Sequence, residues 1–350
     1  MNKTKTGIIG AGAISDTYLT NIQKLFPWLE LVCISAAHLE RAKIKAEKYG
    51  IRAVATDRLL ADKEISLVII LTPVDTHYTL IKQALEAGKH VYTEKTVTET
   101  TTQARELMEL AKSKGLYLGS APDTFMGSAI TAAKKALDEG IIGEVNSFSI
   151  SINRNNDQLT GWFPFLRLPG AGALRDYMVY YLTALVFLLG EADRVSAFVR
   201  APYTKRINMV PGSDSFGKEI STPNESIITA NIEMKSGVIG TIHENNESVM
   251  ADRAEFAIYG TTGILMPGNP NSFGEPVKIV RSEGWEPSTV ELLPQKEKYS
   301  GNSRGLGAAE MALAIEENRH HRASDRLACH VLEIIEGIEK SSRDGVFVKI

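Results

Sequence analysis

Two short stretches carry residues of suitable type and spacing for their side chains to accept or donate a proton. In the first, Glu94-Lys95 follows His90–Thr93, which has the composition of a buried strand. In the second, Asp176 and Tyr180 are four residues apart, so on a helix they share a face, one turn apart. Desolvation lowers the pKa of a lysine toward the range useful for acid–base chemistry. A solvated Glu-Lys pair and a core tyrosine are the structural alternatives, and we favour catalytic roles for Lys95, Asp176 and Tyr180.

The surroundings of Asp176 support this interpretation. The segment 174–189 is otherwise nearly all apolar, and a carboxylate in such a setting costs free energy unless it has a partner. Arg175, Lys95 and a bound substrate are the candidate partners. The entry Gly170-Ala171-Gly172 has almost no side chains, so we expect it to let a ligand approach closely.

A glycine turn near the start of the chain is typical of a phosphate-binding loop. The apolar run Gly7–Ile9 leads into Gly10-Ala11-Gly12, and Ala13 and Ile14 then open a helix. The N-terminus of a helix offers unpaired N–H groups and the positive end of the helix dipole, which suit a pyrophosphate. Ser15 stands at the third position of the dinucleotide fingerprint, where Gly or Ala is usual. The turn predicts a dinucleotide site, the alternative being an ordinary strand-to-helix connection.

A second loop is expected to lie along the same dinucleotide. Thr72 and Pro73 end the buried strand 66–72, and ligands of doubly wound sheets bind just outside the carboxyl ends of the strands. We assign Thr72, Pro73 and His77 to this cofactor loop, together with Glu94 and Lys95. For His77, a side chain bonded to the backbone at the helix N-terminus is the simpler role.

The region that would meet the adenosine ribose favours NADP over NAD. An acidic residue about 20 positions after the fingerprint usually binds the ribose 2′-hydroxyl, but 35–38 contains none. Ser35, His38 and Arg41 could instead contact a 2′-phosphate.

The elements that must position these residues alternate between strands and helices up to residue 121. Strands are predicted at 6–9, 30–35, 52–55, 66–72, 90–93 and 116–119, and helices from 13 onward and at 39–49, 57–60, 76–87 and 100–114. This alternation indicates an α/β fold with a right-handed, doubly wound parallel sheet. Residues 1–121 are therefore predicted to form the dinucleotide-binding domain.

Residues 122–350 show a different rhythm and are predicted to form a substrate and oligomerisation domain. Helices are expected at 129–139, 174–189, 306–318 and 325–343, strands at 145–153, 195–200, 226–234, 238–245, 254–259, 277–280 and 290–293, and loops at 160–172 and 203–224. The pattern predicts an open, mostly antiparallel sheet with helices on one side. Its uncovered face suggests a homodimer or homotetramer.

Composition narrows the class of partner. The chain has 350 residues and a formal charge of −3, so it has no basic field for nucleic acid, and no apolar run is long enough to span a membrane. Cys33 and Cys329 each lie in an apolar run, as buried free thiols do in a reducing, cytoplasmic compartment. The histidines and cysteines show no metal-ligand spacing, which argues against a metal-dependent enzyme.

Four segments together resemble the glucose-fructose oxidoreductase, inositol dehydrogenase and rhizopine-catabolism family, Gfo/Idh/MocA. They are GIIGAGAIS, THYTLIKQALEAGKHVYTEKT, GAGALRDYMVYYLTALVFLLGE and ACHVLEIIEGIEKSSRDG, in the order that the family has them. The resemblance implies a Rossmann domain followed by an α/β domain with an open sheet. It also implies an NAD or NADP cofactor and a sugar, polyol or related hydroxy substrate.

The resemblance also places the family's functional residues on this chain. Its Glu-Lys-Pro motif falls on Glu94-Lys95-Thr96, so Lys95 matches the catalytic lysine. Thr96 replaces the usual proline, and a threonine strongly disfavours the cis bond that a proline can take. The family's Asp and His fall on Asp176 and Tyr180, so a tyrosine replaces the histidine.

The implied reaction is hydride transfer between a nicotinamide and a carbinol carbon, with Lys95, Asp176 and Tyr180 at the reacting hydroxyl. The candidate substrate contacts are Arg154, Trp162, Phe163, Arg167 and His243. The aromatic pair could equally be a plug under its own loop, and His243 an outward-facing strand residue. A catalytically silent binding or regulatory protein of the same fold remains the alternative function, since both Thr96 and Tyr180 depart from the common motif.

Overall fold

The computed structural model describes residues 3–249, 253–283, 286–293, 295 and 297–350. Its contacts divide the chain into two compact units. The first unit comprises residues 1–126 and 302–332, and the second comprises residues 127–301 and 333–350. The sequence predicts a boundary at 121 with everything later in one domain, whereas the contacts return the closing segment 302–332 to the first unit.

The first unit is built on a parallel sheet in which six described strands follow the order β3-β2-β1-β4-β5-β6. The strands are β1 (Thr4–Ile9), β2 (Leu29–Ser35), β3 (Arg52–Ala53), β4 (Leu67–Ile70), β5 (His90–Thr93) and β6 (Leu118–Ser120). The order reverses between β1 and β4, which is the switch point where doubly wound sheets bind ligands. The doubly wound parallel sheet predicted from the sequence is confirmed.

Helices cover both faces of this sheet. They are α1 (Ala13–Leu25), α2 (Leu39–Tyr49), α3 (Thr56–Ala61), α4 (His77–Glu86), α5 (Thr101–Ser113), α9 (Leu306–Glu316) and the start of α10 (Asp325–Asp344). Right-handed crossovers on either side of the switch point put α1 and α2 on one face and α4 and α5 on the other. All four residues of β4 are consequently buried. Cys33 and Cys329 are buried in this core and form no disulfide, as predicted.

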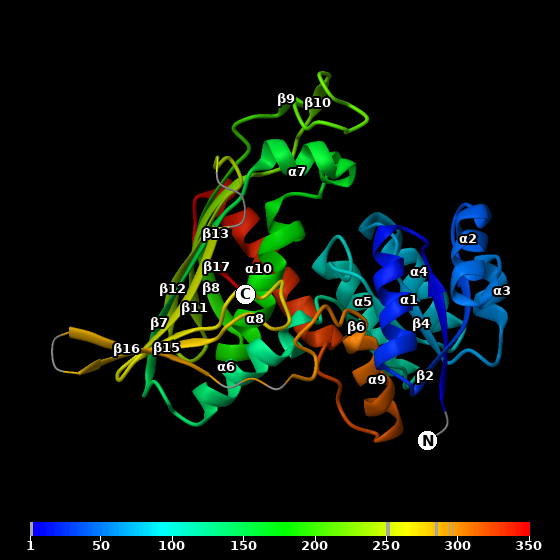
Figure 1. Ribbon diagram of the computed structural model, residues 1–350, viewed down its shortest axis with the longest axis horizontal. Helices are drawn as coiled ribbons and strands as arrows, with labels where there is room; N and C mark the ends of the chain where they lie inside the picture. Colours follow the sequence, from blue (N-terminus) through cyan, green and yellow to red (C-terminus); the bar gives the residue numbers. More distant parts are fainter. Residues whose placement is uncertain (1–2, 250–252, 284–285, 294, 296) are drawn as a thin grey trace. The chain divides into compact units, whose positions relative to one another are not determined.

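Specific hydrogen bonds attach the closing segment to the first unit. The indole Nε1 of Trp28 donates to the carbonyl of Ala309 at 2.8 Å. Asp123 is buried and accepts from the backbone N–H groups of Gly305 (2.9 Å) and Gly307 (3.0 Å), at the N-terminus of α9. The orange α9 therefore belongs with the blue and cyan elements in Figure 1. No local pattern in 302–332 indicates this return.

The second unit is built on a sheet in which nine described strands follow the order β16-β15-β14-β13-β7-β12-β11-β8-β17. The strands are β7 (Val145–Asn153), β8 (Ala192–Arg200), β11 (Ile227–Met234), β12 (Ile239–Asn245), β13 (Arg253–Gly260), β14 (Ile264–Met266), β15 (Lys278–Glu283), β16 (Glu286–Leu292) and β17 (Val348–Lys349). β7 and β12 pair in parallel, and the other described pairs are antiparallel. The predicted mostly antiparallel sheet is confirmed, with the short strands β14 and β17 added.

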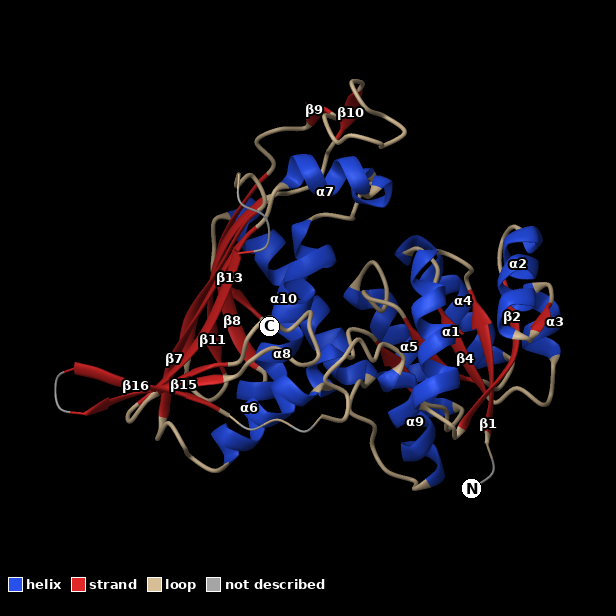
Figure 2. Ribbon diagram, viewed as in Figure 1, coloured by secondary structure: helices blue, strands red, loops and turns tan. Residues whose placement is uncertain are grey.

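Helices cover one face of the second sheet. α6 (Ser128–Asp138), α8 (Val179–Leu189) and the end of α10 lie on the same side in Figure 2. The burial of β7 alternates along its length, as expected for a strand with one covered face. None of the helices in the described ranges has the length and apolar composition needed to cross a membrane.

Three predicted segments differ from the structure. The expected loop 160–172 overlaps α7 (Asn156–Trp162), which begins where the Asn155 side chain caps the N–H of Gln158, and a 3-10 turn, Pro164–Arg167. The expected loop 203–224 holds the ribbon of β9 (Lys205–Ile207) and β10 (Glu219–Ser221). The expected helix 174–189 opens as a π-helical turn, Leu174–Met178.

Candidate functional site

The glycine turn after β1 has room for a ligand at one glycine and none at the other. Gly10 has a φ of +119°, and a Cβ there would lie 2.7 Å from the backbone carbon and oxygen of Leu71. A Cβ at Gly12 would meet no described atom within 4 Å. Gly10 is therefore required by the fold, whereas Gly12 keeps a space open in front of α1.

The N-terminus of α1 is free to bind an anion. Gly12 is its N-cap residue and supplies no side chain to the first-turn N–H groups. Ser15 is buried and its hydroxyl donates to the carbonyl of Gly12 at 2.6 Å, so it stabilises the turn itself. The residues predicted to hold the pyrophosphate, Gly12 and Ala13, are exposed, and Ile14 is half-buried. This arrangement fits the phosphates of a dinucleotide.

Only some of the residues predicted to contact the adenosine ribose are exposed at the end of β2. Ser35 is fully buried, its hydroxyl accepts from Thr56 at 3.2 Å, and its carbonyl accepts from the N–H of Gly10 at 2.8 Å. This burial argues against the predicted direct contact between Ser35 and a 2′-phosphate. His38 and Arg41 are exposed beyond the end of the strand.

His77 connects the two loops that follow β4 and β5. Its ring is fully buried, with Nδ1 2.8 Å from the carbonyl oxygen of Thr96 and Nε2 2.8 Å from that of Thr72. Burial lowers the pKa of this imidazole. His77 therefore bonds to the backbone, and its burial argues against the predicted cofactor contact. Thr72 is half-buried and Pro73 is exposed at the same loop.

The Glu94–Thr96 segment is anchored from both sides. The carboxylate of Glu94 accepts from the hydroxyl of Tyr18 at 2.8 Å and from the N–H of Lys95 at 3.1 Å. Lys95 is half-buried at the carboxyl end of β5, and the Lys95–Thr96 peptide bond is cis. The sequence predicts that threonine disfavours this conformation, and the structure differs from that expectation. Tyr18 was not singled out in the sequence, because its partner is 76 residues away.

We expect Tyr18→Phe to lower the free energy of unfolding by about 1–3 kcal/mol, because it leaves a Glu94 oxygen without its buried donor. Urea unfolding followed by circular dichroism measures the change. Tyr78→Phe is the matched control, because the hydroxyl of Tyr78 donates to Glu106 at an exposed position. We expect that control to change the free energy by less than about 0.5 kcal/mol. Equal effects in the two variants would contradict the anchoring role of Tyr18.

In the second unit, Asp176 pairs with an arginine that lies beside the carboxyl end of β7. Nη1 of Arg154 is 3.3 Å from Oδ2 of Asp176, and both side chains are largely buried. The Arg154 guanidinium also lies 3.9 Å from the centroid of the Tyr177 ring. Arg175, an expected partner of Asp176, instead forms a two-pronged ion pair with Glu339. Arg154 therefore supplies the partner that the apolar helix requires.

The helix that carries Asp176 and Tyr180 changes type between them. Asp176 lies in the π-helical turn, whereas Tyr180 lies in α8. Single π-helical turns inserted into α-helices are frequent at functional sites. Tyr180 is half-buried, and its ring centroid is 6.1 Å from that of Tyr177.

Glu225 occupies the space that the glycine-rich entry opens. Its Oε1 accepts from the N–H of Leu174 at 3.1 Å, and a Cβ at Gly172 would lie 2.1 Å from that oxygen. Burial raises the pKa of Glu225. The sequence predicts that this glycine-rich entry admits a ligand. At Gly172 that prediction is wrong, because the carboxyl group of Glu225 takes the space and binds the N–H of Leu174 at the start of the helix.

A small pocket lies beside Asp176 within the second unit. Its lining includes Arg154, Asp176, Asn156, Thr222, Glu225 and Asn246. Two of the predicted substrate residues, Arg154 and Asp176, thus meet at one cavity. Glu225 and Asn246 were not predicted to line it.

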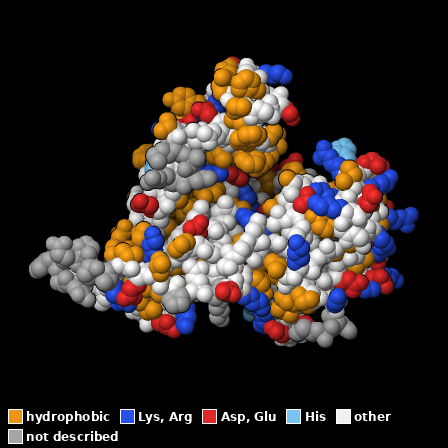
Figure 3. Space-filling view, viewed as in Figure 1, with side chains coloured by type: hydrophobic (Ala, Val, Ile, Leu, Met, Phe, Trp, Pro, Cys, Tyr) orange, Lys and Arg blue, Asp and Glu red, His pale blue; other side chains and the backbone are white. Residues whose placement is uncertain are grey.

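The other predicted substrate contacts lie elsewhere. Trp162 and Phe163 are 56% and 48% exposed and contribute to the apolar surface over α7 and the β9–β10 ribbon (Figure 3). Arg167 donates to the carbonyls of Thr160 (2.7 Å) and Gly161 (3.2 Å), so it supports the end of α7. His243 bonds to Thr229 across the sheet, as an outward-facing strand residue does.

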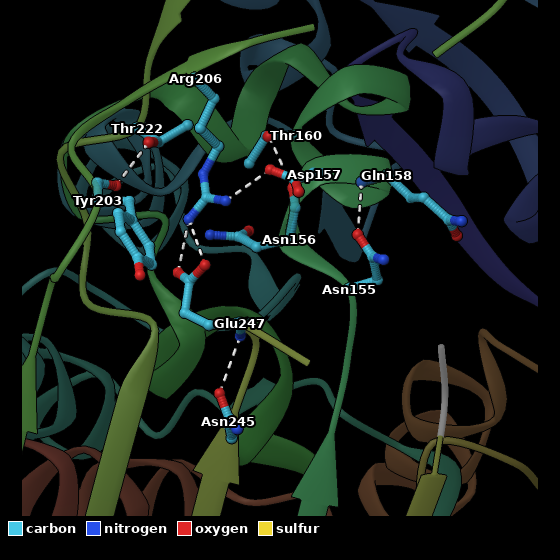
Figure 4. A network of polar contacts seen from close by, with 10 residues as sticks. All are labelled: Asn155, Asn156, Asp157, Gln158, Thr160, Tyr203, Arg206, Thr222, Asn245 and Glu247. Atoms are coloured by element: carbon cyan, nitrogen blue, oxygen red, sulfur yellow. Dashed lines mark hydrogen bonds and ion pairs between the residues drawn. The ribbon is translucent and has the colours of Figure 1, made fainter. Parts of the chain in front are cut away.

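One arginine anchors the wall of the pocket. Figure 4 shows Arg206 of β9 between Asp157 of α7 and Glu247. Its Nη1 is 2.6 Å from Asp157, and its Nη2 is 2.5 and 2.6 Å from the two carboxylate oxygens of Glu247. This network holds α7, which contributes Asn156 to the pocket, against the chain that follows β12.

A buried carboxyl group of the second unit lies close to two residues that line the pocket, Arg154 and Asn246. Glu244 is fully buried, and neither carboxyl oxygen has a hydrogen-bond partner among the described residues. Burial raises its pKa to about 8, while Arg154 acts in the opposite direction. The sequence offers a signal for this buried carboxyl group, because Glu244 lies at an inward-facing position of a strand whose buried and less buried residues alternate.

Within the described ranges, no three His, Cys, Asp or Glu residues form a group that could hold a metal ion.

Comparisons with known proteins agree with this architecture. The profile described as "Oxidoreductase family, NAD-binding Rossmann fold" matches residues 4–121, and that of the GFO/IDH/MocA C-terminal domain matches residues 130–266. The chain is 36% identical to the uncharacterized oxidoreductase YdgJ of Escherichia coli, over 53% of this chain and 54% of that protein. The match therefore spans about half the length of that relative.

Two further proteins illustrate the range of similar chains. The chain is 32% identical to dTDP-3,4-didehydro-2,6-dideoxy-alpha-D-glucose 3-reductase of Streptomyces violaceoruber, over 60% of this chain and 62% of that protein. The solved structure of levoglucosan dehydrogenase in complex with NADH and levoglucosan is similar to this chain with a TM-score of 0.85 at 19% identity, covering 100% of both chains. At this identity the likeness shows the fold.

Proposed function

Because the chain belongs to the Gfo/Idh/MocA family of NAD-binding oxidoreductases, we propose that it transfers hydride between a nicotinamide dinucleotide and a hydroxyl-bearing or keto carbon of a sugar, glycoside or polyol. The open N-terminus of α1 at the Gly10–Gly12 turn carries the proposal, because it provides an anion site at the switch point of the parallel sheet. The sugar-related names of similar proteins support the substrate class.

Lys95, Asp176 and Tyr180 are proposed to act on one substrate hydroxyl. A bound nicotinamide supplies the hydride acceptor or donor. One of the three side chains accepts the hydroxyl proton during oxidation, and Lys95 stabilises the negative charge that develops on the oxygen. The ion pair with Arg154 holds the Asp176 carboxylate in place beside the pocket. In the reverse direction the same groups return the proton to a ketone oxygen.

NADP is the proposed cofactor in preference to NAD. Residues 35–38 contain no acid for a ribose 2′-hydroxyl, and the exposed His38 and Arg41 offer charge or hydrogen bonds to a 2′-phosphate. Ser35 is omitted from this set because it is buried.

We also propose that the protein is cytoplasmic and that it forms a homodimer or homotetramer through the second sheet. The face opposite α8 exposes large apolar side chains, including Phe198 (70%) and Ile239 (58%). Covering such a face with a second copy removes apolar surface from water. Light scattering of the purified protein measures the assembly.

A substrate screen tests the function. The purified chain is incubated with NADP or NAD and a panel of sugars, glycosides and polyols, and the absorbance of reduced nicotinamide is followed. We expect turnover with at least one neutral sugar or polyol and a larger kcat/KM for NADP than for NAD. Dinucleotide binding without turnover of any substrate would instead indicate the catalytically silent binding protein, and unchanged activity after chelation would exclude a metal-dependent reaction.

A further inference from the structure

Resting on the proposed function, we propose that Glu244 is a positioning residue for Asp176. Its buried carboxyl group keeps a proton, donates a hydrogen bond through it to the Asn246 side chain, and so leaves the Arg154 guanidinium to the Asp176 carboxylate. All four residues belong to the second unit.

Glu244 lies near the middle of the second sheet, between two apolar neighbours. Its register partner on β11 is Ile228, and its register partner on β7 is Ile152. All three side chains are fully buried. The flanking strands therefore present no charge and no side-chain donor at this level, so an ionised carboxylate here would lose its hydration without a replacement from the sheet.

Ionisable groups act on Glu244 from four neighbouring segments. They are Arg154, which follows β7, Asp176 of the π-helical turn, Glu225, which precedes β11, and Tyr181 of α8. Arg154 favours the ionised form of Glu244, whereas Asp176 and Glu225 oppose it.

The arginines of this cluster already serve the other two carboxyl groups. Arg154 pairs with Asp176 at 3.3 Å, and Arg175 acts on Glu225, which also accepts from a backbone N–H. Glu244 therefore has to share Arg154 with Asp176. As the most deeply buried of the three carboxyl groups, it is the one that keeps its proton.

The Asn246 side chain offers the acceptor that a neutral carboxylic acid needs. It lies within hydrogen-bond reach of the Glu244 carboxyl group. Its Oδ1 is buried, and among the described residues neither this oxygen nor the two carboxyl oxygens of Glu244 have a donor. A proton on Glu244 changes this, because its O–H donates and the amide oxygen accepts. One proton thus gives both buried side chains a hydrogen bond.

The protonation state of Glu244 then determines how firmly Asp176 is held. Burial raises the pKa of Glu244 to about 8, so the side chain is neutral at pH 7. At higher pH it becomes a second carboxylate beside Arg154. The guanidinium is then divided between two carboxylates, and its hold on Asp176 weakens.

Urea unfolding of the full chain at a series of pH values from 5 to 9 tests the buried proton. Between a pKa of 4.5 for an ordinary glutamate and about 8 for Glu244, the folded state binds more protons than the unfolded state. The free energy of unfolding therefore falls as the pH rises through this range. Glu244→Gln keeps the shape and a donor but does not titrate. We expect the unfolding equilibrium constant of the wild type to rise by at least about tenfold more than that of Glu244→Gln.

Two further variants separate the competition for Arg154 from a general effect of charge. Glu255→Gln is the matched control, because Glu255 is exposed on β13 of the same sheet, and we expect it to follow the wild type. Asp176→Asn leaves Arg154 to Glu244 and lowers the pKa of Glu244. We therefore expect the pH-dependent loss of stability to occur at least about one pH unit lower than in the wild type. This shift is measured against the wild type, so it tests the inference even when Glu244→Gln does not fold.

The pH profile of kcat tests the positioning role. We expect kcat of the wild type to fall above about pH 8 as Asp176 loses its hold on Arg154. Glu244→Gln should move this alkaline limb upward by at least about one pH unit, whereas Glu255→Gln should leave it in place.

The outcomes distinguish this inference from the proposed function. Parallel unfolding curves for the wild type and Glu244→Gln, an unshifted curve for Asp176→Asn, or an alkaline limb that Glu244→Gln does not move would each overturn the inference. The expected unfolding curves without any hydride transfer would uphold the action of Glu244 on Asp176 and contradict the proposed function. Hydride transfer with parallel unfolding curves would do the reverse.

Discussion

We expect Lys95→Ala to lower kcat by about 10²–10⁴-fold, the usual contribution of a positioned acid–base group. The side chain is half-buried at the carboxyl end of β5, in a segment fixed by the bond between Tyr18 and Glu94. The pyrophosphate is proposed to bind at the glycine turn after β1, so the Kd for the dinucleotide should change by less than about threefold, below 1 kcal/mol. Steady-state kinetics and a fluorescence titration of the reduced dinucleotide measure the two quantities.

Lys112→Ala is the control for charge and helix content in the same unit. Lys112 is exposed in the last turn of α5, and we expect its replacement to leave both kcat and Kd unchanged. Undiminished turnover in Lys95→Ala would remove Lys95 from the mechanism. A parallel loss of dinucleotide affinity would show that its role is in binding instead.

We expect Gly12→Val to weaken dinucleotide binding by at least about 100-fold, which is 2.7 kcal/mol or more, with little change in stability. The valine side chain would project into the open space in front of α1 that the pyrophosphate is proposed to fill. Because no described atom lies within 4 Å of that space, the apoprotein accommodates the side chain. We expect the free energy of unfolding to fall by about 1 kcal/mol or less, the range for an altered N-cap residue.

Gly10→Ala provides the contrast. Gly10 has a φ of +119°, and an added Cβ would lie 2.7 Å from the backbone of Leu71. The substitution therefore destabilises the folded state, and we expect the free energy of unfolding to fall by at least about 1–3 kcal/mol. Calorimetric binding and urea unfolding of both variants separate the two effects. Normal dinucleotide affinity in Gly12→Val would contradict the assignment of this turn as the phosphate site.

Tertiary contacts revised several roles that residue type had suggested. Ser35 and His77 are polar residues next to predicted ligand loops, yet both are fully buried and bonded within the first unit. Gly172 resembles a glycine that admits a ligand, but the carboxyl group of Glu225 takes its space. In each case the deciding partner is remote in sequence or lies on another element, so no local pattern could identify it.

The sequence by itself determined the alternating strands and helices of the doubly wound first unit, the mostly antiparallel character of the second sheet and the buried state of Cys33 and Cys329. Hydrophobic periodicity, helix-stop glycines and the glycine turn are local signals, because each depends only on residues that are close together in the sequence. Only the tertiary structure decided that 302–332 joins the first unit, that Arg154 pairs with Asp176, and that Asn246 lines the pocket beside Asp176. Such pairings depend on which distant side chains meet when the sheets assemble, and neither residue type nor spacing along the chain specifies that.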